Sequence, residues 1–305
     1  MTPRYLDPLT DFGFKRLFGT EANKDLLIAF LNALLPPAHQ IASLEFRNPE
    51  WVGKHTLDRR ALFDLYCRTD DGRRFIVELQ RVRQRYFKDR CLYYSTFPIQ
   101  EQAERGEWSY EIAPVYVVAL LDFALVPGTP AAESGEYLHV VQLKDARGRV
   151  FYDKYMQVYV ELPRFRKTER ALADDVDRWL YFLRHVGELN HRPPSFTGDM
   201  FDKAFREASF AQLSPSERQL YEESMRHTRD MRNAFLTAEA EGEARGEARG
   251  EARGEARGEA RGLALGEKRK ALEIARSLLA TGMDVAQVSQ LTGLDAATVG
   301  TLLDR

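Results

Sequence analysis

Cysteine and long apolar runs are scarce in this chain. Two cysteines, Cys67 and Cys91, stand among 305 residues, which excludes a disulfide framework. The longest apolar run, 114–121, has about eight residues, whereas a helix needs about 20 to cross a bilayer. No apolar segment typical of a secretory signal follows the first residues. These absences predict a cytoplasmic protein without a membrane span.

Several catalytic and metal-binding motifs are also missing. The six histidines show no HxxxH spacing and the cysteines no CxxC spacing, so a zinc site is not expected. No GxSxG, GxGxxG or GxxxxGK stretch occurs, which argues against a serine hydrolase, a dinucleotide enzyme and a P-loop enzyme. The composition is 44% hydrophobic and 30% charged, so most of the chain should fold.

The small net charge of −2 conceals an uneven distribution. Residues 1–100 carry 16 Lys and Arg against 12 Asp and Glu, while residues 101–305 carry 28 against 34. A basic N-terminal part favours a polyanionic partner, although the excess is small.

A four-residue repeat, EARG, occurs five times in succession at 243–262. On a helix, residues four apart stack on one side, so Glu lies on Glu and Arg on Arg, and each Gly costs about 1 kcal/mol relative to Ala. A solvated spacer arm and a self-associating helical stalk both fit this pattern. The repeat suggests four parts: a core at 1–165, a helical extension packed on it at 166–241, a linker or extended helix at 242–266, and a small helical tail at 267–305.

The body upstream of the repeat has the pattern of a mixed α/β domain with a central sheet. A hairpin is indicated by two β-rich runs on either side of a Thr-Asp-Asp-Gly turn. Strands are expected at 60–68, 73–80, 114–123, 137–143 and 155–162, and helices at 23–35, 82–103, 168–186, 201–210 and 214–236.

The tail has the spacing of a helix-turn-helix, with short helices at 267–280, 285–291 and 296–302. Its composition points elsewhere, because residues 284–305 hold three Asp and a single Arg. A recognition helix without basic or amide side chains has little to offer a DNA groove. Oligomerisation or partner docking is therefore favoured over duplex binding, which stays open.

The two hairpin strands carry acids within apolar runs. Asp64 is the single acid in its run, and on the second strand Glu78 and Gln80 share a face because side chains alternate. With the turn centred near Asp71, paired residue numbers sum to about 142, which places Asp64 opposite Glu78 with Cβ atoms about 5 Å apart. Two carboxylates that close repel unless a cation lies between them. Oxygen ligands favour Mg²⁺, with Mn²⁺ as a substitute.

A simpler interpretation of the same residues is a pair of half-exposed strand acids, with Asp64 paired to a neighbour such as Arg74. A register shift of one residue would put the two carboxylates on opposite faces of the sheet. Spacing alone does not decide between this interpretation and a metal site.

The order of Asp64, a β-turn and Glu78-Leu79-Gln80 resembles the PD-(D/E)XK nuclease superfamily, in which Gln replaces the usual final Lys in some branches. The chain is more closely similar to the recombination-promoting nuclease (Rpn) family, also described as PD-(D/E)XK putative transposases. The charged tetrad repeat before a short helical tail is typical of that family. Further agreement comes from the opening DFGFKRLFG at 11–19, the Asp-Gly turn, the Arg90-x-x-Tyr93-Tyr94 helix, and Pro114-Val115-Tyr116 leading to Leu121-Asp122-Phe123.

The resemblance implies a restriction-endonuclease-like core in which Asp64, Glu78 and the main-chain carbonyl of Leu79 bind Mg²⁺ or Mn²⁺. It implies hydrolysis of phosphodiester bonds, with Asp64, Glu78 and Gln80 as the catalytic set. Gln80 stands where Lys is usual, and an amide can orient water but can neither accept a proton nor supply charge. Base catalysis would then fall to water activated by the metal, to bulk water or to the substrate phosphate.

Two further groups of residues could serve that site. Asp11 and Lys15, four apart on a helix, match the opening motif and either border the site or form a surface salt bridge. A run of basic residues directly after the motif could bind the DNA backbone without reading bases, with a salt-dependent affinity, or could be a solvated helix face. The run comprises Arg81, Arg83, Arg85, Lys88 and Arg90.

The leading hypothesis is an Mg²⁺-dependent endodeoxyribonuclease that acts on double-stranded DNA with little sequence preference, associated with recombination or mobile DNA. The alternatives are a catalytically weak DNA-binding protein of the same fold and a self-associating scaffold. A homo-oligomer formed through the arm and tail is compatible with each of them.

Overall fold

The computed structural model describes residues 3–48, 50–51, 61–103, 106–125 and 136–302. It divides into two compact units, Met1–Asn233 and Ala234–Arg305. The first unit holds the β-sheet and the helices that cover it. The second holds the greater part of one long helix and two short helices after it.

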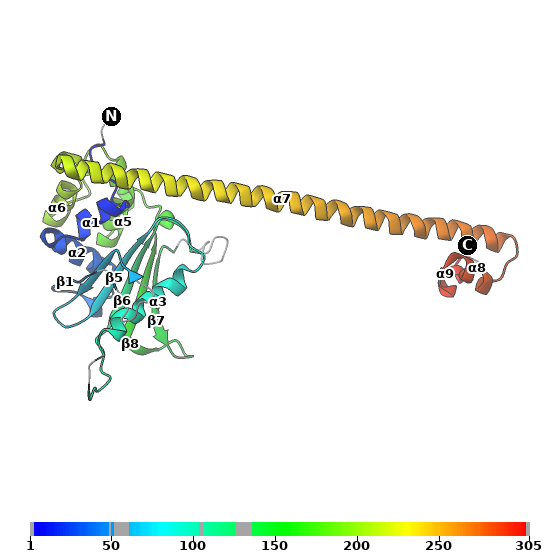
Figure 1. The fold of residues 1–305 in the computed structure, drawn as a ribbon, viewed down its shortest axis with the longest axis horizontal. Coiled ribbons are helices and arrows are strands. Elements are labelled where there is room, and N and C mark those ends of the chain that lie inside the picture. Colours follow the sequence, from blue (N-terminus) through cyan, green and yellow to red (C-terminus); the bar gives the residue numbers. More distant parts are fainter. Residues whose placement is uncertain (1–2, 49, 52–60, 104–105, 126–135, 303–305) are drawn as a thin grey trace. The chain divides into compact units, whose positions relative to one another are not determined.

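A mixed six-stranded sheet forms the centre of the first unit, with strand order β1-β4-β5-β6-β8-β7 (Figure 1). The three central strands, β5, β6 and β8, are parallel, and β4 and β7 run antiparallel to their neighbours. A separate pair consists of β2 (Glu50–Trp51) and β3 (Ala61–Leu62). The strands of the main sheet are β1 (Glu45–Phe46), β4 (Leu65–Arg68), β5 (Arg74–Gln80), β6 (Val115–Leu121), β7 (Leu138–Lys144) and β8 (Val150–Glu161).

Helices cover both faces of this sheet (Figure 1). Phe75 and Val77 of β5 face the larger apolar cluster, while Ile76 faces the smaller one, because side chains alternate along a strand. The smaller cluster is covered by α3 (Phe87–Gln100). Glu78 therefore lies on the face that α3 covers. The larger cluster is covered by α1 (Asp11–Phe18), α2 (Lys24–Leu34), α5 (Asp175–His185) and α6 (Asp199–Glu207).

The hairpin has the register that its turn predicts. Leu65 pairs with Val77 and Tyr66 with Ile76, so paired numbers sum to 142 as expected. The expected length of the first strand is wrong, since β4 begins only at Leu65 and Asp64 precedes it. The cause is local: the Asp64 carboxylate accepts the Leu79 amide hydrogen that a longer ladder would have used.

The helix after the motif also begins later than expected, at Phe87 and not at 82. The segment before it is committed to other contacts. The Gln80 side-chain amide donates to the Val82 carbonyl at 3.0 Å, and Arg81 forms ion pairs outside the segment. The helix can therefore start only once the chain has left these contacts. In the same way, α5 begins at Asp175 and not at 168, after an Asp174 N-cap.

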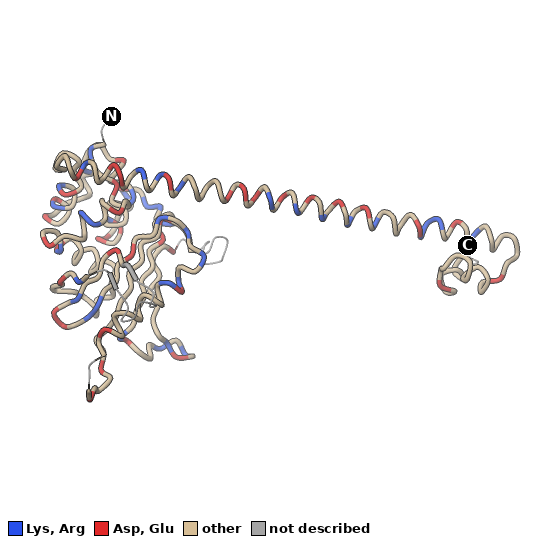
Figure 2. Tube along the Cα trace, viewed as in Figure 1, with Lys and Arg blue, Asp and Glu red and all other residues tan. Residues whose placement is uncertain are grey.

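The chain leaves the sheet domain in one helix, α7 (Pro215–Ala280), which includes the whole EARG repeat. Figure 2 shows acidic and basic positions recurring along it. In the second unit, Ala275 of α7 packs with Val288 of α8 (Val285–Thr292) and Val299 of α9 (Ala296–Gly300). Among the described residues, no helix is both long enough and apolar enough to cross a membrane.

Candidate functional site

The hairpin places Asp64 against the end of β5. An Asp64 carboxylate oxygen accepts a hydrogen bond from the Leu79 backbone amide at 2.6 Å. Burial raises the pKa of Asp64, and this effect outweighs the opposing contribution of the Leu79 hydrogen bond. The carboxylate is thus held in a fixed position in a poorly solvated place.

Glu78 is the second carboxylate of the site and is only 5% exposed. Burial raises its pKa to about 8, and the negative charge of Asp64 adds to this effect, while Arg90 acts in the opposite direction. Its Oε1 atom is buried and has no hydrogen-bond partner. A buried carboxylate oxygen without a donor is costly, and a bound cation would remove that cost.

The donor set at this point suits a hard divalent cation. Within a strand, the N–H and C=O of one residue point to the same side, so the Leu79 carbonyl faces the side on which Asp64 lies. Two carboxylates and one carbonyl are all-oxygen ligands of the type that Mg²⁺ accepts, with water completing its shell. The described residues contain no group of three or more His, Cys, Asp or Glu suited to a metal, so this pair relies on the carbonyl and water.

Gln80 lies beside a cation that comes from α3. The Arg90 guanidinium donates to the Gln80 side-chain oxygen at 2.5 Å and lies 3.6 Å from a Glu78 carboxylate oxygen. The rings of Phe87 and Tyr94 lie under it, at 4.9 and 5.5 Å from their centroids. Arg90 thus places positive charge next to Gln80. In the sequence, Arg90 belongs only to the basic run and to the motif shared with the family, and neither predicts its contact with Gln80.

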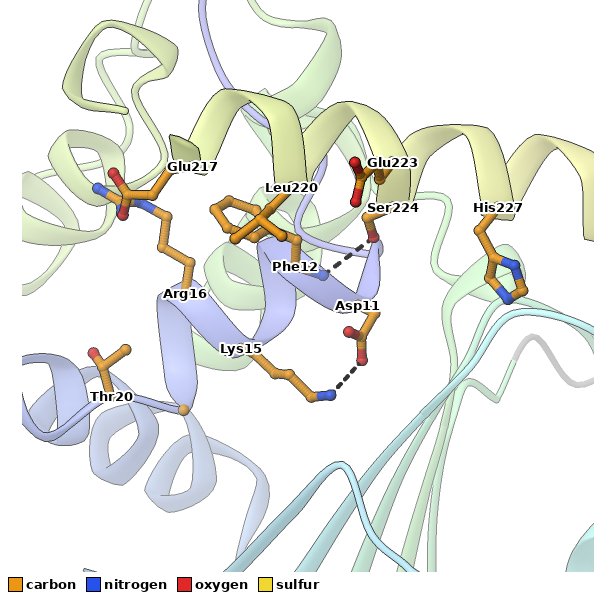
Figure 3. Close-up of a pocket in the computed structure, with 11 residues that line it drawn as sticks. Asp11, Phe12, Lys15, Arg16, Thr20, Glu217, Leu220, Glu223, Ser224 and His227 are labelled. Carbon is orange, nitrogen blue, oxygen red and sulfur yellow. Dashed lines mark hydrogen bonds and ion pairs between the residues drawn. The ribbon is translucent and has the colours of Figure 1, made fainter. Parts of the chain in front are cut away.

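Asp11 and Lys15 lie on α1 and form a salt bridge at 2.8 Å. Their charges act in opposite directions on the pKa of Asp64, so both side chains are near enough to influence that carboxylate. The salt bridge is therefore confirmed, while a place for this pair at the border of the site stays a prediction. Asp11 and Lys15 line a pocket of about 790 Å³ between α1 and the first turns of α7, where Leu220 and His227 come from α7 (Figure 3).

The basic run after the motif is divided by the fold. Arg81 is held between Asp7 and Asp122, at 3.1 and 3.4 Å, and so joins the N-terminal segment to the end of β6. Arg90 contacts the site, as described above. The three basic residues that stay exposed to solvent are Arg83, Arg85 and Lys88.

This division predicts different consequences for substitutions within the run. Replacing Arg83, Arg85 and Lys88 together with Ala should weaken DNA binding at least tenfold at low salt. The slope of log affinity against log salt concentration should also become shallower, by the amount expected for the loss of about three phosphate contacts. Arg81→Ala should instead lower the melting temperature, because two half-buried carboxylates lose their partner. Fluorescence anisotropy over a salt series, with calorimetry alongside, separates the two effects. An unchanged salt dependence in the triple variant would exclude this surface from DNA contact.

Comparison with known families identifies the larger part of the chain. Residues 8–238 match the model of the PD-(D/E)XK nuclease family transposases. The chain belongs to this family. PD-(D/E)XK nucleases generally use divalent metal ions, and the oxygen atoms gathered at the end of β5 are of a type that such ions accept.

Residues 268–303 match the C-terminal helix-turn-helix domain of the Rpn/YhgA-like nuclease family. The helix-turn-helix spacing in the tail is therefore confirmed, and its presence in a PD-(D/E)XK nuclease suggests DNA as a partner, despite the acidic composition that had favoured protein docking. No curated protein and no solved structure matches the chain.

Proposed function

We propose that this PD-(D/E)XK protein is a metal-dependent endonuclease that hydrolyses phosphodiester bonds in double-stranded DNA with little sequence preference, in recombination or mobile DNA. The observation that carries the proposal is the buried carboxylate pair at the end of β5, in which a Glu78 oxygen lacks any donor. Such a pair is costly without a cation, which argues for a binding role and against a purely structural one.

Asp64, Glu78 and the Leu79 carbonyl would hold the ion, with Mg²⁺ preferred and Mn²⁺ acceptable. A divalent ion at this point supplies Lewis-acid stabilisation of the scissile phosphate and makes water more acidic. The Leu79 amide keeps the Asp64 carboxylate in place, and the walls of the smaller apolar cluster keep bulk water away from Glu78. Asp11 and Lys15 border the same site from α1.

Arg90 would supply the positive charge that Gln80 lacks. Its guanidinium is anchored by Gln80 and Gln84 and by the ring faces of α3, so it is oriented before substrate arrives. A guanidinium is a strong donor to phosphate oxygens. Gln80 then acts as a positioning residue for Arg90 and for water.

The exposed residues Arg83, Arg85 and Lys88 would contact the DNA backbone close to this site. Backbone contacts position a duplex without specifying its sequence, which accounts for the proposed lack of preference at the cleavage site. The helix-turn-helix tail would add a second contact with DNA.

Asp64→Asn tests the proposal directly. The parent protein should nick supercoiled plasmid with Mg²⁺ or Mn²⁺ and not with EDTA, and Asp64→Asn should lose at least a hundredfold in rate while still binding DNA. A single-stranded DNA and an RNA of the same sequence, assayed beside the plasmid, show which polymer is accepted. Cleavage that persists in EDTA, or in Asp64→Asn, would refute the assignment.

The Gln80 position also supports a second candidate, a catalytically weak protein of this fold that acts by binding DNA. In that case the parent protein binds duplex as tightly as the Asp64→Asn variant, and neither cleaves it with any divalent ion. The plasmid assay therefore separates the two candidates.

A further inference from the structure

The EARG segment of α7 is a helix that lacks internal support. Glu and Arg within one unit are two residues apart and lie on opposite sides, whereas residues four apart carry like charges. Among the described residues of 242–266, the only ion pair is Arg245–Glu241, at 3.9 Å. Seven glycines, from Gly242 to Gly266, add about 1 kcal/mol each relative to Ala. A solitary helix of this composition is poorly stabilised.

The repeat nevertheless builds an ordered surface on that helix. Its alanines form one row, which continues into Leu236 at one end and Ala264 at the other. Because four residues advance about 400° along a helix, each residue type makes its own row. The alanine row is flanked by the glutamate row on one side and the arginine row on the other. All of these side chains are exposed.

We propose that α7 pairs through its alanine row with α7 of a second copy of this chain, in parallel orientation. The order Glu-Ala-Arg decides the orientation. When two right-handed helices face each other in parallel, the side that carries Glu on one helix meets the side that carries Arg on the other, along both edges of the contact. In an antiparallel pair, Glu meets Glu along one edge and Arg meets Arg along the other. The repeat therefore favours the parallel pair and opposes the antiparallel one.

The geometry of the contact follows from the period of four. A row with this spacing winds to the right around a helix of 3.6 residues per turn, so two such rows meet in a right-handed crossing at about −50°. Small side chains allow the close approach that this crossing needs, and the charged rows lie within reach at both edges. A parallel pair also carries its two helix-turn-helix tails at the same end, as a protein that binds two DNA half-sites requires.

Distance measurements between identical spin labels test the orientation in the full-length protein. One variant carries the label at Ala240→Cys and a second variant carries it at Ala264→Cys. In a parallel pair, the distance between the two copies of the label should be below about 25 Å in both variants. An antiparallel pair centred on Ala252 would give about 36 Å for each, from the rise of 1.5 Å per residue over 24 residues. Cys67 and Cys91 are buried and do not compete for the label. Long distances at both positions would overturn the proposal.

Two sets of substitutions test the contact itself by sedimentation. Replacing Ala248, Ala252 and Ala256 with Gln should raise the dissociation constant of the dimer at least tenfold, because the longer side chains keep the helices apart. The matched control replaces Gly250, Gly254 and Gly258 with Gln, which improves helix propensity on another row and should leave the dimer intact. The proposal would be overturned if the parent protein were monomeric at about 50 μM. It would also be overturned if the alanine-row and glycine-row variants weakened the dimer equally. Neither result depends on nuclease activity.

Discussion

Glu78→Gln should abolish metal-dependent DNA cleavage and at the same time stabilise the metal-free protein above about pH 6. The substitution keeps the shape of the side chain and removes its charge. Cleavage should fall by about a thousandfold or more, since a metal contributes several kcal/mol of transition-state stabilisation. Stability should rise, because burial of Glu78 beside Asp64 obliges the folded protein to keep a proton that the unfolded chain releases above about pH 4.5.

The sign of the pH dependence follows from the raised pKa of Glu78. The folded protein holds this proton up to about pH 8, whereas the unfolded chain releases it near 4.5. The folded state therefore binds more protons between these values, and the free energy of unfolding falls as the pH rises, by up to about 1.4 kcal/mol per unit. The fall is complete above about pH 8. Glu78→Gln should lack this slope.

Urea denaturation at a series of pH values from 4 to 9, in EDTA, measures the effect. The parent and the variant should be equally stable near pH 4 and should differ by about 3–4 kcal/mol at pH 8. Saturating Mg²⁺ should reduce the difference by stabilising the parent alone. Equal slopes in both proteins would contradict the buried, high-pKa state of Glu78, and a variant that still cleaves DNA would contradict its catalytic role.

Arg90→Met should reduce the cleavage rate by about 10² to 10³, the usual cost of removing one electrostatic contact to a transition state. The aliphatic side chain keeps the packing on Phe87 and Tyr94. Adding Gln80→Lys to this variant should restore the rate to within about tenfold of the parent, because the cation returns to the strand position that Lys usually occupies. Arg83→Met, which removes an exposed charge on the same segment, is the matched control and should alter DNA affinity alone.

Binding of Mg²⁺ by calorimetry supplies a measurement that is independent of turnover. Arg90→Met should bind the ion at least as tightly as the parent, since a competing cation beside Glu78 is gone. A loss of both metal binding and fold would assign Arg90 a structural role. Failure of Gln80→Lys to restore cleavage in a folded, metal-binding variant would show that its charge does not act on the phosphate.

The register of the hairpin and the face that Glu78 occupies could be predicted from the sequence, because both depend on local rules. A turn fixes the sum of paired residue numbers, and alternation fixes the side of the strand. The point at which β4 begins was not predictable in this way. It depends on a side-chain hydrogen bond from the Leu79 amide to Asp64, which competes with the ladder.

The basic run shows the same limit. Its composition was plain in the sequence, but Arg81, Arg83 and Arg90 have three different environments, and that of Arg81 depends on Asp7 and Asp122, which lie far along the chain. A helix was expected from 82 onward because the spacing of apolar residues carries no information about the long-range ion pairs of Arg81. The start of α5 differs, because the Asp174 N-cap is a local signal, three residues from its partner Asp177, that the expected start at 168 overlooked.

The sequence by itself determined the residue types of the site, the central buried strand, the charge rows of the repeat and the helix-turn-helix spacing, because each depends on spacing along one segment. Only the tertiary structure decided that Glu78 is buried with an unpaired oxygen, that Arg90 of α3 lies beside Gln80, and that Arg81 forms ion pairs with Asp7 and Asp122. Burial and charge pairing are set by side chains that the fold brings together from distant parts of the chain.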